Sequence, residues 1–225
     1  MGDITISAAD GNFSAYHAPA SGQAAGGVVV IQEIFGVNSH IRAVCDRLAQ
    51  AGFDVLAPDL FHRSEPGVQL GYGEADFKRG FELMQALDHA KALADIDACM
   101  RHLRQGGGKV GVLGFCMGGL LSFRSAANLE PDAAVAYYGG GIANFLGEAG
   151  QIRCPIQFHF GEKDPFIPMT DVDAIRKVAD GLEESELYVY PAEHGFNCDQ
   201  RGSYDAASAA LAWQRSVDFL RRHLG

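Results

Sequence analysis

A cysteine flanked by glycines lies at the centre of the motif Gly114-Phe115-Cys116-Met117-Gly118. The apolar residues 109–113 before it predict a buried strand, and residues 120–127 after it predict a helix. A nucleophile between a strand and a helix, with a glycine two positions away on each side, is the arrangement of the nucleophile elbow, written G-x-S-x-G for serine. The glycines are expected because a Cβ at either position would collide with neighbouring backbone. Free cysteines and glycine-rich turns also occur without chemistry, so the motif alone leaves a structural role for Cys116 open.

A carboxylate and a histidine follow two later strands. Asp164 comes after the predicted strand 156–160, and His194 comes after the predicted strand 186–190. Loops at the carboxyl ends of parallel strands gather functional groups, and the chain order nucleophile, acid, histidine is that of α/β-hydrolases. We therefore expect Cys116 to attack a carbonyl as a thiolate, His194 to accept and return the proton, and Asp164 to fix the imidazole tautomer.

Strands that alternate with helices along the chain predict an α/β fold, with a mostly parallel central sheet and helices on both faces. A length of 225 residues fits one domain over residues 1–225. A hairpin is expected over residues 3–17, and the clearest buried strand covers residues 27–31. Residues 61–80 break the pattern, and a long irregular segment of this kind is more often a functional cover than a defect. The other expected strands are 54–58 and 133–139, and the other expected helices are 40–52, 81–105, 171–181 and one from about residue 203 to the C-terminus.

The composition excludes some classes of binding partner. A net charge of −10 argues against binding to nucleic acid or to an anionic membrane. The five scattered cysteines show neither disulfide nor zinc-finger spacing, which favours reduced thiols and a cytoplasmic setting. No signal peptide, membrane span or clustered metal-ligand motif is apparent, so we expect no metal and no cofactor.

Five motifs together resemble the dienelactone hydrolase (carboxymethylenebutenolidase) family, and the resemblance extends from about residue 3 to residue 222. They are Gln32-Glu33-Ile34-Phe35-Gly36-Val37-Asn38, Gly114-Phe115-Cys116-Met117-Gly118-Gly119, Tyr137-Tyr138-Gly139, Asp164-Pro165-Phe166-Ile167-Pro168 and His194-Gly195-Phe196. The resemblance implies an α/β-hydrolase fold and cofactor-free opening of a lactone or small ester, of the dienelactone type. The implied route is a Cys116–His194–Asp164 triad with an acyl-enzyme thioester.

The same resemblance assigns further residues. Glu33 would hold or accept the Cys116 proton in the resting enzyme and swing away when substrate binds. The backbone amides of Ile34 and Met117 would form an oxyanion hole, which agrees with their places after the nucleophile and after an early strand. Phe35 and Tyr138 would line the substrate site.

The sequence departs from the family where relatives bind a substrate carboxylate. The two arginines used there align with Phe77 and Cys198. Lys78, Arg79 and Arg201 lie nearby in sequence and are candidate replacements, although a shifted cation need not keep a bidentate geometry.

Other substrates and other roles therefore stay open. One alternative is a thioesterase or carboxylesterase that acts on another acyl group. A less favoured one is a non-catalytic relative that senses oxidants through Cys116, because a sensor needs a reactive thiol but no complete proton shuttle. The expected partner is a small molecule, and the sequence leaves monomer and small homo-oligomer equally open.

Overall fold

The computed structural model describes residues 1–225 and contains one eight-stranded sheet with the strand order β1-β2-β4-β3-β5-β6-β7-β8. The strands are β1 (Gly2–Ala8), β2 (Gly11–Ala18), β3 (Gly27–Ile31), β4 (Asp54–Pro58), β5 (Val110–Phe115), β6 (Ala133–Tyr137), β7 (Ile156–Gly161) and β8 (Ser185–Tyr190). The β1–β2 hairpin is antiparallel and β2 pairs antiparallel with β4. The strands β3 to β8 all run parallel to one another. The predicted α/β fold with a mostly parallel sheet is confirmed.

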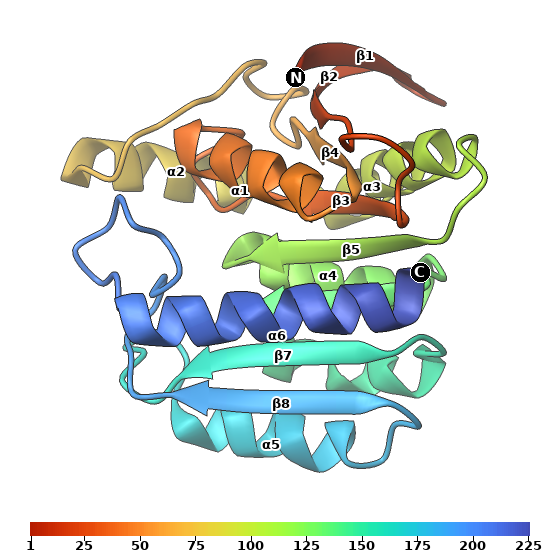
Figure 1. Cartoon of the computed structure of the whole chain (residues 1–225). Coiled ribbons are helices and arrows are strands. Elements are labelled where there is room, and N and C mark those ends of the chain that lie inside the picture. The colour runs from red at the N-terminus through yellow and green to blue at the C-terminus, as the bar shows by residue number, and fades with distance from the viewer.

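Helices cover both faces of this sheet. They are α1 (Ser39–Gln50), α2 (Glu74–Ala86), α3 (His89–Arg104), α4 (Met117–Asn128), the 3₁₀ helix η1 (Ile142–Gln151), α5 (Met169–Ala179) and α6 (Ala206–Leu224). Helices α1 and α6 lie in front of the strands in Figure 1, while α3, α4 and α5 lie behind them. Every residue of β3, β5, β6 and β7 is buried, as expected for strands covered on two sides.

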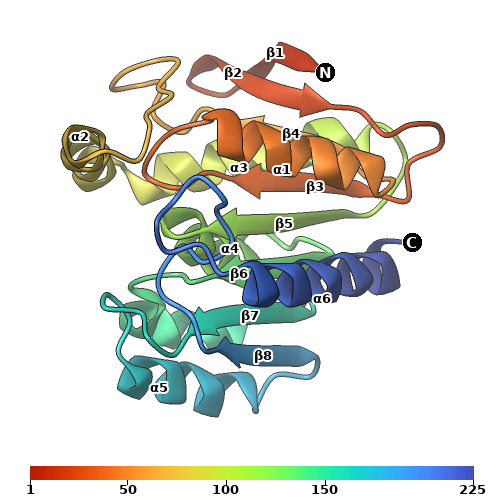
Figure 2. The same cartoon turned by 60° about the vertical axis from the view of Figure 1, so that its left-hand side comes forward.

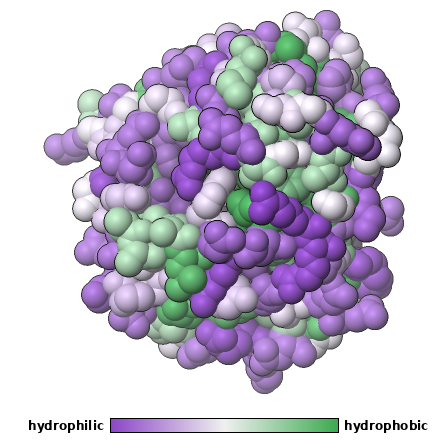
Figure 3. All heavy atoms as spheres, viewed as in Figure 1, coloured by the Kyte–Doolittle hydropathy of each residue, from purple (hydrophilic) through white to green (hydrophobic).

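The outer surface contrasts with this core. Hydrophilic residues cover most of the face shown in Figure 3, and hydrophobic residues appear there only in small areas. None of the helices is long and apolar enough to cross a membrane.

The segment predicted to be irregular over residues 61–80 is shorter in the structure. Helix α2 begins at Glu74, and the single helix expected over 81–105 is two helices that separate at Leu87 and Asp88. Leu87 is extended, and the Asp88 carboxylate accepts hydrogen bonds from the first backbone N–H groups of α3. This N-cap starts a new helix in the middle of a continuous helical pattern.

The irregular segment before α2 is tied to the body of the protein. Arg63 donates hydrogen bonds of 2.6 and 2.9 Å to the two oxygens of buried Asp95 in α3. Leu70 N–H donates to the carbonyl of Phe35, and Gly36 pairs with Gln69 in an antiparallel bridge. These contacts hold the segment against the loop that follows β3. In Figure 2, α2 and the loop between β8 and α6 lie at the same end of the molecule.

The glycines of the Cys116 motif fill positions where no side chain fits. A Cβ on Gly118 would lie 2.2 Å from the Ile31 carbonyl oxygen, and one on Gly114 would lie 2.0 Å from the Gly118 carbonyl oxygen. Because both obstacles are backbone, neither can move aside without displacing a strand or the helix start. A Cβ at either glycine would thus collide with backbone, as expected from the sequence.

Gly118→Ala is expected to lower the free energy of unfolding by about 3 kcal/mol or more, because the added methyl group must displace the β3 backbone. Urea denaturation followed by circular dichroism measures this change. Gly147→Ala is the matched control, since a Cβ at Gly147 meets no atom within 4 Å and should change stability by less than about 0.5 kcal/mol. Equal denaturation midpoints for the two variants would contradict the prediction.

Candidate active site

Cys116 occupies a sharp turn between β5 and α4. Its backbone angles are φ 56° and ψ −116°, a region that non-glycine residues rarely adopt. The Cys116 N–H donates to the Tyr137 carbonyl at 3.0 Å, which attaches the turn to the neighbouring strand β6. Strain that is held in place by surrounding backbone is characteristic of functional sites. The turn presents the Cys116 sulfur, which is partly exposed, at the carboxyl end of the sheet.

His194 and Asp164 meet beside this sulfur. His194 Nδ1 lies 2.7 Å from Asp164 Oδ2, and both side chains are buried. The other oxygen of Asp164 accepts a hydrogen bond of 2.8 Å from the Phe166 N–H, which fixes the carboxylate orientation. Burial by itself would lower the pKa of His194, but the charge of Cys116, with hydrogen bonds to Asp164 and Cys116, raises that pKa to about 10. The imidazole is thus held between an acid and a thiol, as proton transfer between Cys116 and His194 requires.

Two backbone N–H groups are available next to the sulfur. Met117 is the first residue of α4, where helical N–H groups have no partner inside the helix. Ile34 lies in the loop after β3, and neither its N–H nor that of Met117 donates to an acceptor within the protein. Both residues line the same cavity as Cys116. A negative oxygen that forms on a bound substrate would find two free donors here.

Glu33 belongs to the same loop and is fully buried, and both of its side-chain oxygens have partners. Arg201 donates to Oε1 at 3.1 Å, and the Tyr72 hydroxyl donates to Oε2 at 3.0 Å. No hydrogen bond joins Glu33 to Cys116, whose sulfur faces His194 instead. The structure therefore brings Glu33 together with Arg201 and Tyr72, an arrangement that corresponds to the carboxylate turned away from the nucleophile.

A cavity of about 340 Å³ opens above Cys116. Three aromatic side chains at its rim remain well exposed: Phe77 at 40%, Phe81 at 43% and Phe166 at 59%. Arg201 is the single cationic arginine or lysine on its wall, and its guanidinium is already paired with Glu33. The residues that line the cavity are Ile34, Phe35, Phe77, Phe81, Met84, His89, Cys116, Met117, Leu120, Gly140, Gly141, Phe166, His194 and Arg201. The site is a mainly apolar pocket with the nucleophile at its base.

Four of the expected substrate-binding residues lie away from the cavity wall. Lys78 and Arg79 are outside it, and Arg79 pairs with exposed carboxylates on Glu65 and Glu82. The reason is the helix geometry: α2 turns Phe77 and Phe81 towards the pocket and the intervening cations towards solvent.

The other two lie deeper. Tyr138 is completely buried, and the centroid of its ring lies 5.1 Å from the centroid of the His194 ring. Cys198 is also completely buried and lies beside the Tyr72 hydroxyl, and burial raises the pKa of its thiol to about 11. Of the candidate cations, the structure brings only Arg201 to the cavity.

Two residues of the site carry signals that sequence reasoning did not use. Tyr72 stands between two glycines in the segment before α2, and the structure places its hydroxyl on Glu33. His40 lies in the first turn of α1, and one of its nitrogens is within 4.8 Å of Glu33 and Cys198 ligand atoms. The available clue for His40 was its place two residues after the Gln32–Asn38 motif, and for Tyr72 it was the glycine on each side.

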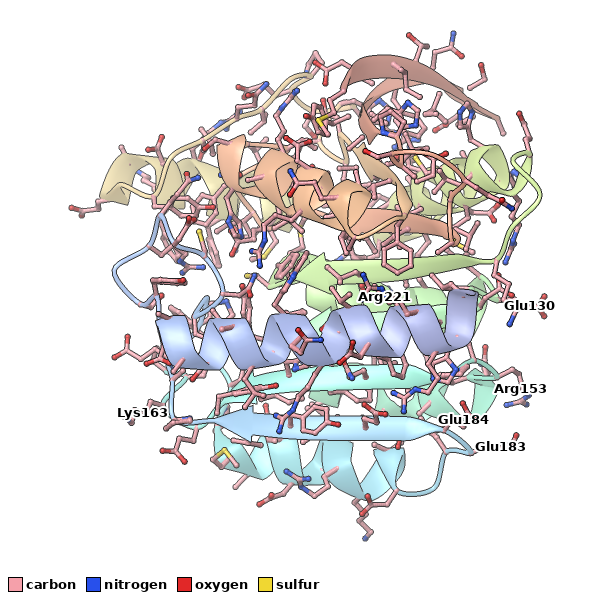
Figure 4. All side chains as sticks on the ribbon, viewed as in Figure 1. Glu130, Arg153, Lys163, Glu183, Glu184 and Arg221 are labelled. Atoms are coloured by element: carbon pink, nitrogen blue, oxygen red, sulfur yellow. The ribbon has the colours of Figure 1, made fainter.

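A larger open groove of about 710 Å³ lies at the opposite end of the sheet. Figure 4 shows Glu130, Arg153, Glu183 and Glu184 at that end, whereas Lys163 lies at the carboxyl end of the strands. Burial raises the pKa of Cys154, the groove's cysteine, to about 12. The groove also holds a histidine–carboxylate pair, His223 and Glu184 at 3.5 Å, but Cys154 is not among the groups that shift the pKa of His223, whereas Cys116 raises that of His194. The smaller cavity is therefore the candidate active site.

Comparison with known proteins identifies the family. The model of the dienelactone hydrolase family matches residues 13–224. The chain belongs to this family. It is 39% identical to a provisionally named carboxymethylenebutenolidase of Azospirillum brasilense over the full length of both chains. It is 35% identical to the carboxymethylenebutenolidase of Pseudomonas putida, over 86% of this chain and 84% of that protein.

Solved structures give the same assignment. A crystal structure of a provisionally assigned dienelactone hydrolase from Klebsiella pneumoniae matches with a TM-score of 0.85 and 33% identity, covering 96% of each chain. This dienelactone hydrolase family member has the α/β-hydrolase fold and is a hydrolase that acts on ester or lactone bonds.

Proposed function

We propose that this hydrolase opens lactones and small esters by nucleophilic catalysis at Cys116, with His194 and Asp164 as its proton-transfer pair. The observation that carries the proposal is the position of His194, which is 2.7 Å from Asp164 and against the Cys116 sulfur. A cysteine, an imidazole and an orienting carboxylate in contact constitute the arrangement of covalent acyl transfer.

The first half of the reaction forms a thioester. The Cys116 thiolate attacks the carbonyl carbon, and the oxygen that becomes negative accepts hydrogen bonds from the Ile34 and Met117 N–H groups. The carbon–oxygen bond to the leaving alcohol or enol then breaks, and protonated His194 gives its proton to that oxygen. In a lactone the leaving oxygen is part of the same molecule, so the whole ring-opened substrate stays bound to Cys116 through the thioester.

The second half releases the acid. His194 is now neutral and accepts a proton from a water molecule that attacks the thioester carbonyl. Collapse of the second tetrahedral intermediate expels the Cys116 thiolate, and the carboxylic acid leaves. Asp164 keeps Nδ1 of His194 protonated throughout, so that Nε2 is the nitrogen that exchanges protons. In this scheme Glu33 acts on Cys116 only after it leaves Arg201 and Tyr72.

The walls of the cavity favour an uncharged substrate. A substrate carboxylate would have to share Arg201 with the buried Glu33, which would leave one uncompensated negative charge in an apolar pocket. The rim residues Phe77 and Phe81 offer contacts to an aromatic or aliphatic group instead. The specificity proposed is for small esters and lactones without a charge, in preference to dienelactone itself.

The test is hydrolysis of a matched substrate pair: an aryl ester of butyrate and the corresponding ester of succinate, which adds one carboxylate. We expect kcat/KM to be about 10-fold or more higher for the neutral ester, and dienelactone to be turned over more slowly than a neutral enol lactone. A preference for the charged member of both pairs would contradict the specificity. No turnover of any ester or lactone by folded protein would contradict the proposed function.

A chemical readout tests the intermediate separately. Rapid quenching during turnover of a slow ester should give protein whose mass is increased by the acyl group, with the modification on the peptide that contains Cys116. Cys154, which is partly exposed in the distant groove, provides an internal comparison within the same protein. Equal acylation of the two peptides would indicate nonspecific thiol chemistry.

A further inference from the structure

A second group of potential metal ligands lies behind the candidate active site. Glu33, His40 and Cys198 are all buried, and one ligand atom from each lies within 4.8 Å of the other two. The three residues come from the loop after β3, the first turn of α1 and the loop between β8 and α6. A carboxylate, an imidazole and a thiol from three separate segments therefore converge on one point.

Two buried polar side chains in this region have unused hydrogen-bonding atoms. His40 is 3% exposed, and its Nε2 has no hydrogen-bond partner. Asn197 is 4% exposed, and neither atom of its amide group has a partner. Buried polar groups are nearly always paired, because each unpaired group costs about 1–3 kcal/mol. These atoms are therefore available to coordinate or hydrogen-bond a small ligand.

A small pocket gives this region a connection to solvent. It has a volume of about 160 Å³, and both His40 and Asn197 line it together with exposed Asp199. The cavity above Cys116 has a different set of lining residues, which includes neither His40 nor Asn197. A small ion could thus reach His40 without passing through the substrate cavity.

We propose that Glu33, His40 and Cys198 form a binding site for a divalent transition metal of the zinc type. Thiolate, imidazole and carboxylate are the three kinds of ligand that zinc takes in proteins, and three protein ligands leave a fourth position for water. Binding forms one metal–sulfur, one metal–nitrogen and one metal–oxygen bond. The Cys198 thiol releases its proton to solvent in this step, and no group is oxidised or reduced.

The site and the nucleophile share Glu33. Its two oxygens already accept hydrogen bonds from Arg201 and Tyr72, so a bound cation competes with the Arg201 guanidinium for the same negative charge. The Cys198 thiolate supplies the additional negative charge that the metal requires. Occupation therefore weakens the Glu33–Arg201 pair and alters the cavity wall to which Arg201 contributes. Metal binding is thus expected to inhibit hydrolysis, an effect that rests on the function proposed above.

Cobalt(II) is the probe for binding, since it takes zinc sites and its bond to thiolate absorbs in the near ultraviolet. The titration uses the Cys116→Ser protein treated with a chelator, so that the nucleophilic thiol cannot act as a ligand. One equivalent of cobalt should give a thiolate–cobalt band and the intense visible bands of tetrahedral coordination. The same protein with Cys198→Ser should lose the near-ultraviolet band, and His40→Phe should weaken binding at least about 100-fold.

Cys154→Ser is the matched control for a second cysteine change and should leave the cobalt spectrum unaltered. Circular dichroism verifies that each variant is folded, and if Cys198→Ser fails to fold, His40→Phe decides. Absence of the thiolate–cobalt band in folded Cys116→Ser protein would overturn the proposal, as would an unchanged spectrum after loss of Cys198 or His40.

Inhibition provides a separate comparison. Zinc should inhibit ester hydrolysis by wild-type protein reversibly, and His40→Phe should need at least about 100-fold more zinc for the same inhibition. Equal zinc sensitivity of the two proteins would place inhibition at Cys116 and His194 and contradict regulation through this site. If the wild type hydrolyses no ester, the proposed function fails, while the cobalt titration still decides the metal site.

Discussion

Replacement of Cys116 by alanine is expected to lower kcat/KM for ester hydrolysis by at least about 10⁴-fold. The sulfur is the atom that would form the thioester, and neither His194 nor the free N–H groups of Ile34 and Met117 can supply a covalent bond in its place. A 10⁴-fold loss corresponds to about 5.5 kcal/mol of transition-state stabilisation. The measurement is steady-state hydrolysis of a neutral aryl ester by both proteins.

The control for this experiment is Cys154→Ala, which removes a partly exposed thiol far from the cavity and should retain wild-type rates. Circular dichroism should show that the Cys116→Ala protein is folded, since alanine fits the space of cysteine. Residual activity within 10-fold of wild type would mean that water attacks the ester directly, with His194 as general base.

The nucleophile elbow could be predicted because local and global signals agree there. The run over residues 109–113, the two glycines around Cys116 and the helix that follows all require the same backbone. The parallel sheet could be predicted for a similar reason, since β3, β5 and β6 consist of apolar residues bounded by turn signals. The meeting of Asp164 with His194 then follows from the position of each one after its strand.

Helix α2 and the contacts of Glu33 could not be predicted in the same way. The start of α2 at Glu74 has a glycine N-cap with no side-chain hydrogen bond, so the sequence carries little signal at that boundary. Arg201 reaches Glu33 from an irregular loop whose path depends on tertiary contacts. Sequence alignment places Cys198 where relatives have an arginine, but Arg201, three residues further along the chain, brings its guanidinium to the cavity instead.

Removal of the Cys116 sulfur is also expected to change the titration of His194. In the intact protein the charge of Cys116 is the largest of the influences that raise the pKa of His194, to about 10, against the lowering effect of burial. In Cys116→Ala that charge and one hydrogen bond are lost, so the pKa should fall, with Asp164 alone opposing burial. Nuclear magnetic resonance of the imidazole carbons as a function of pH measures both values.

The direction of the shift also sets a pH dependence of stability and rate. Because the pKa of His194 is raised above its ordinary value of 6.5, protonated His194 stabilises the folded protein fully below about pH 6.5, and this contribution is lost as pH rises through about 10. Acylation requires the same proton for the leaving oxygen, so kcat/KM should fall above about pH 10 in the wild type. An unchanged His194 titration in Cys116→Ala would show that Asp164 holds the proton without the sulfur, and would contradict this prediction.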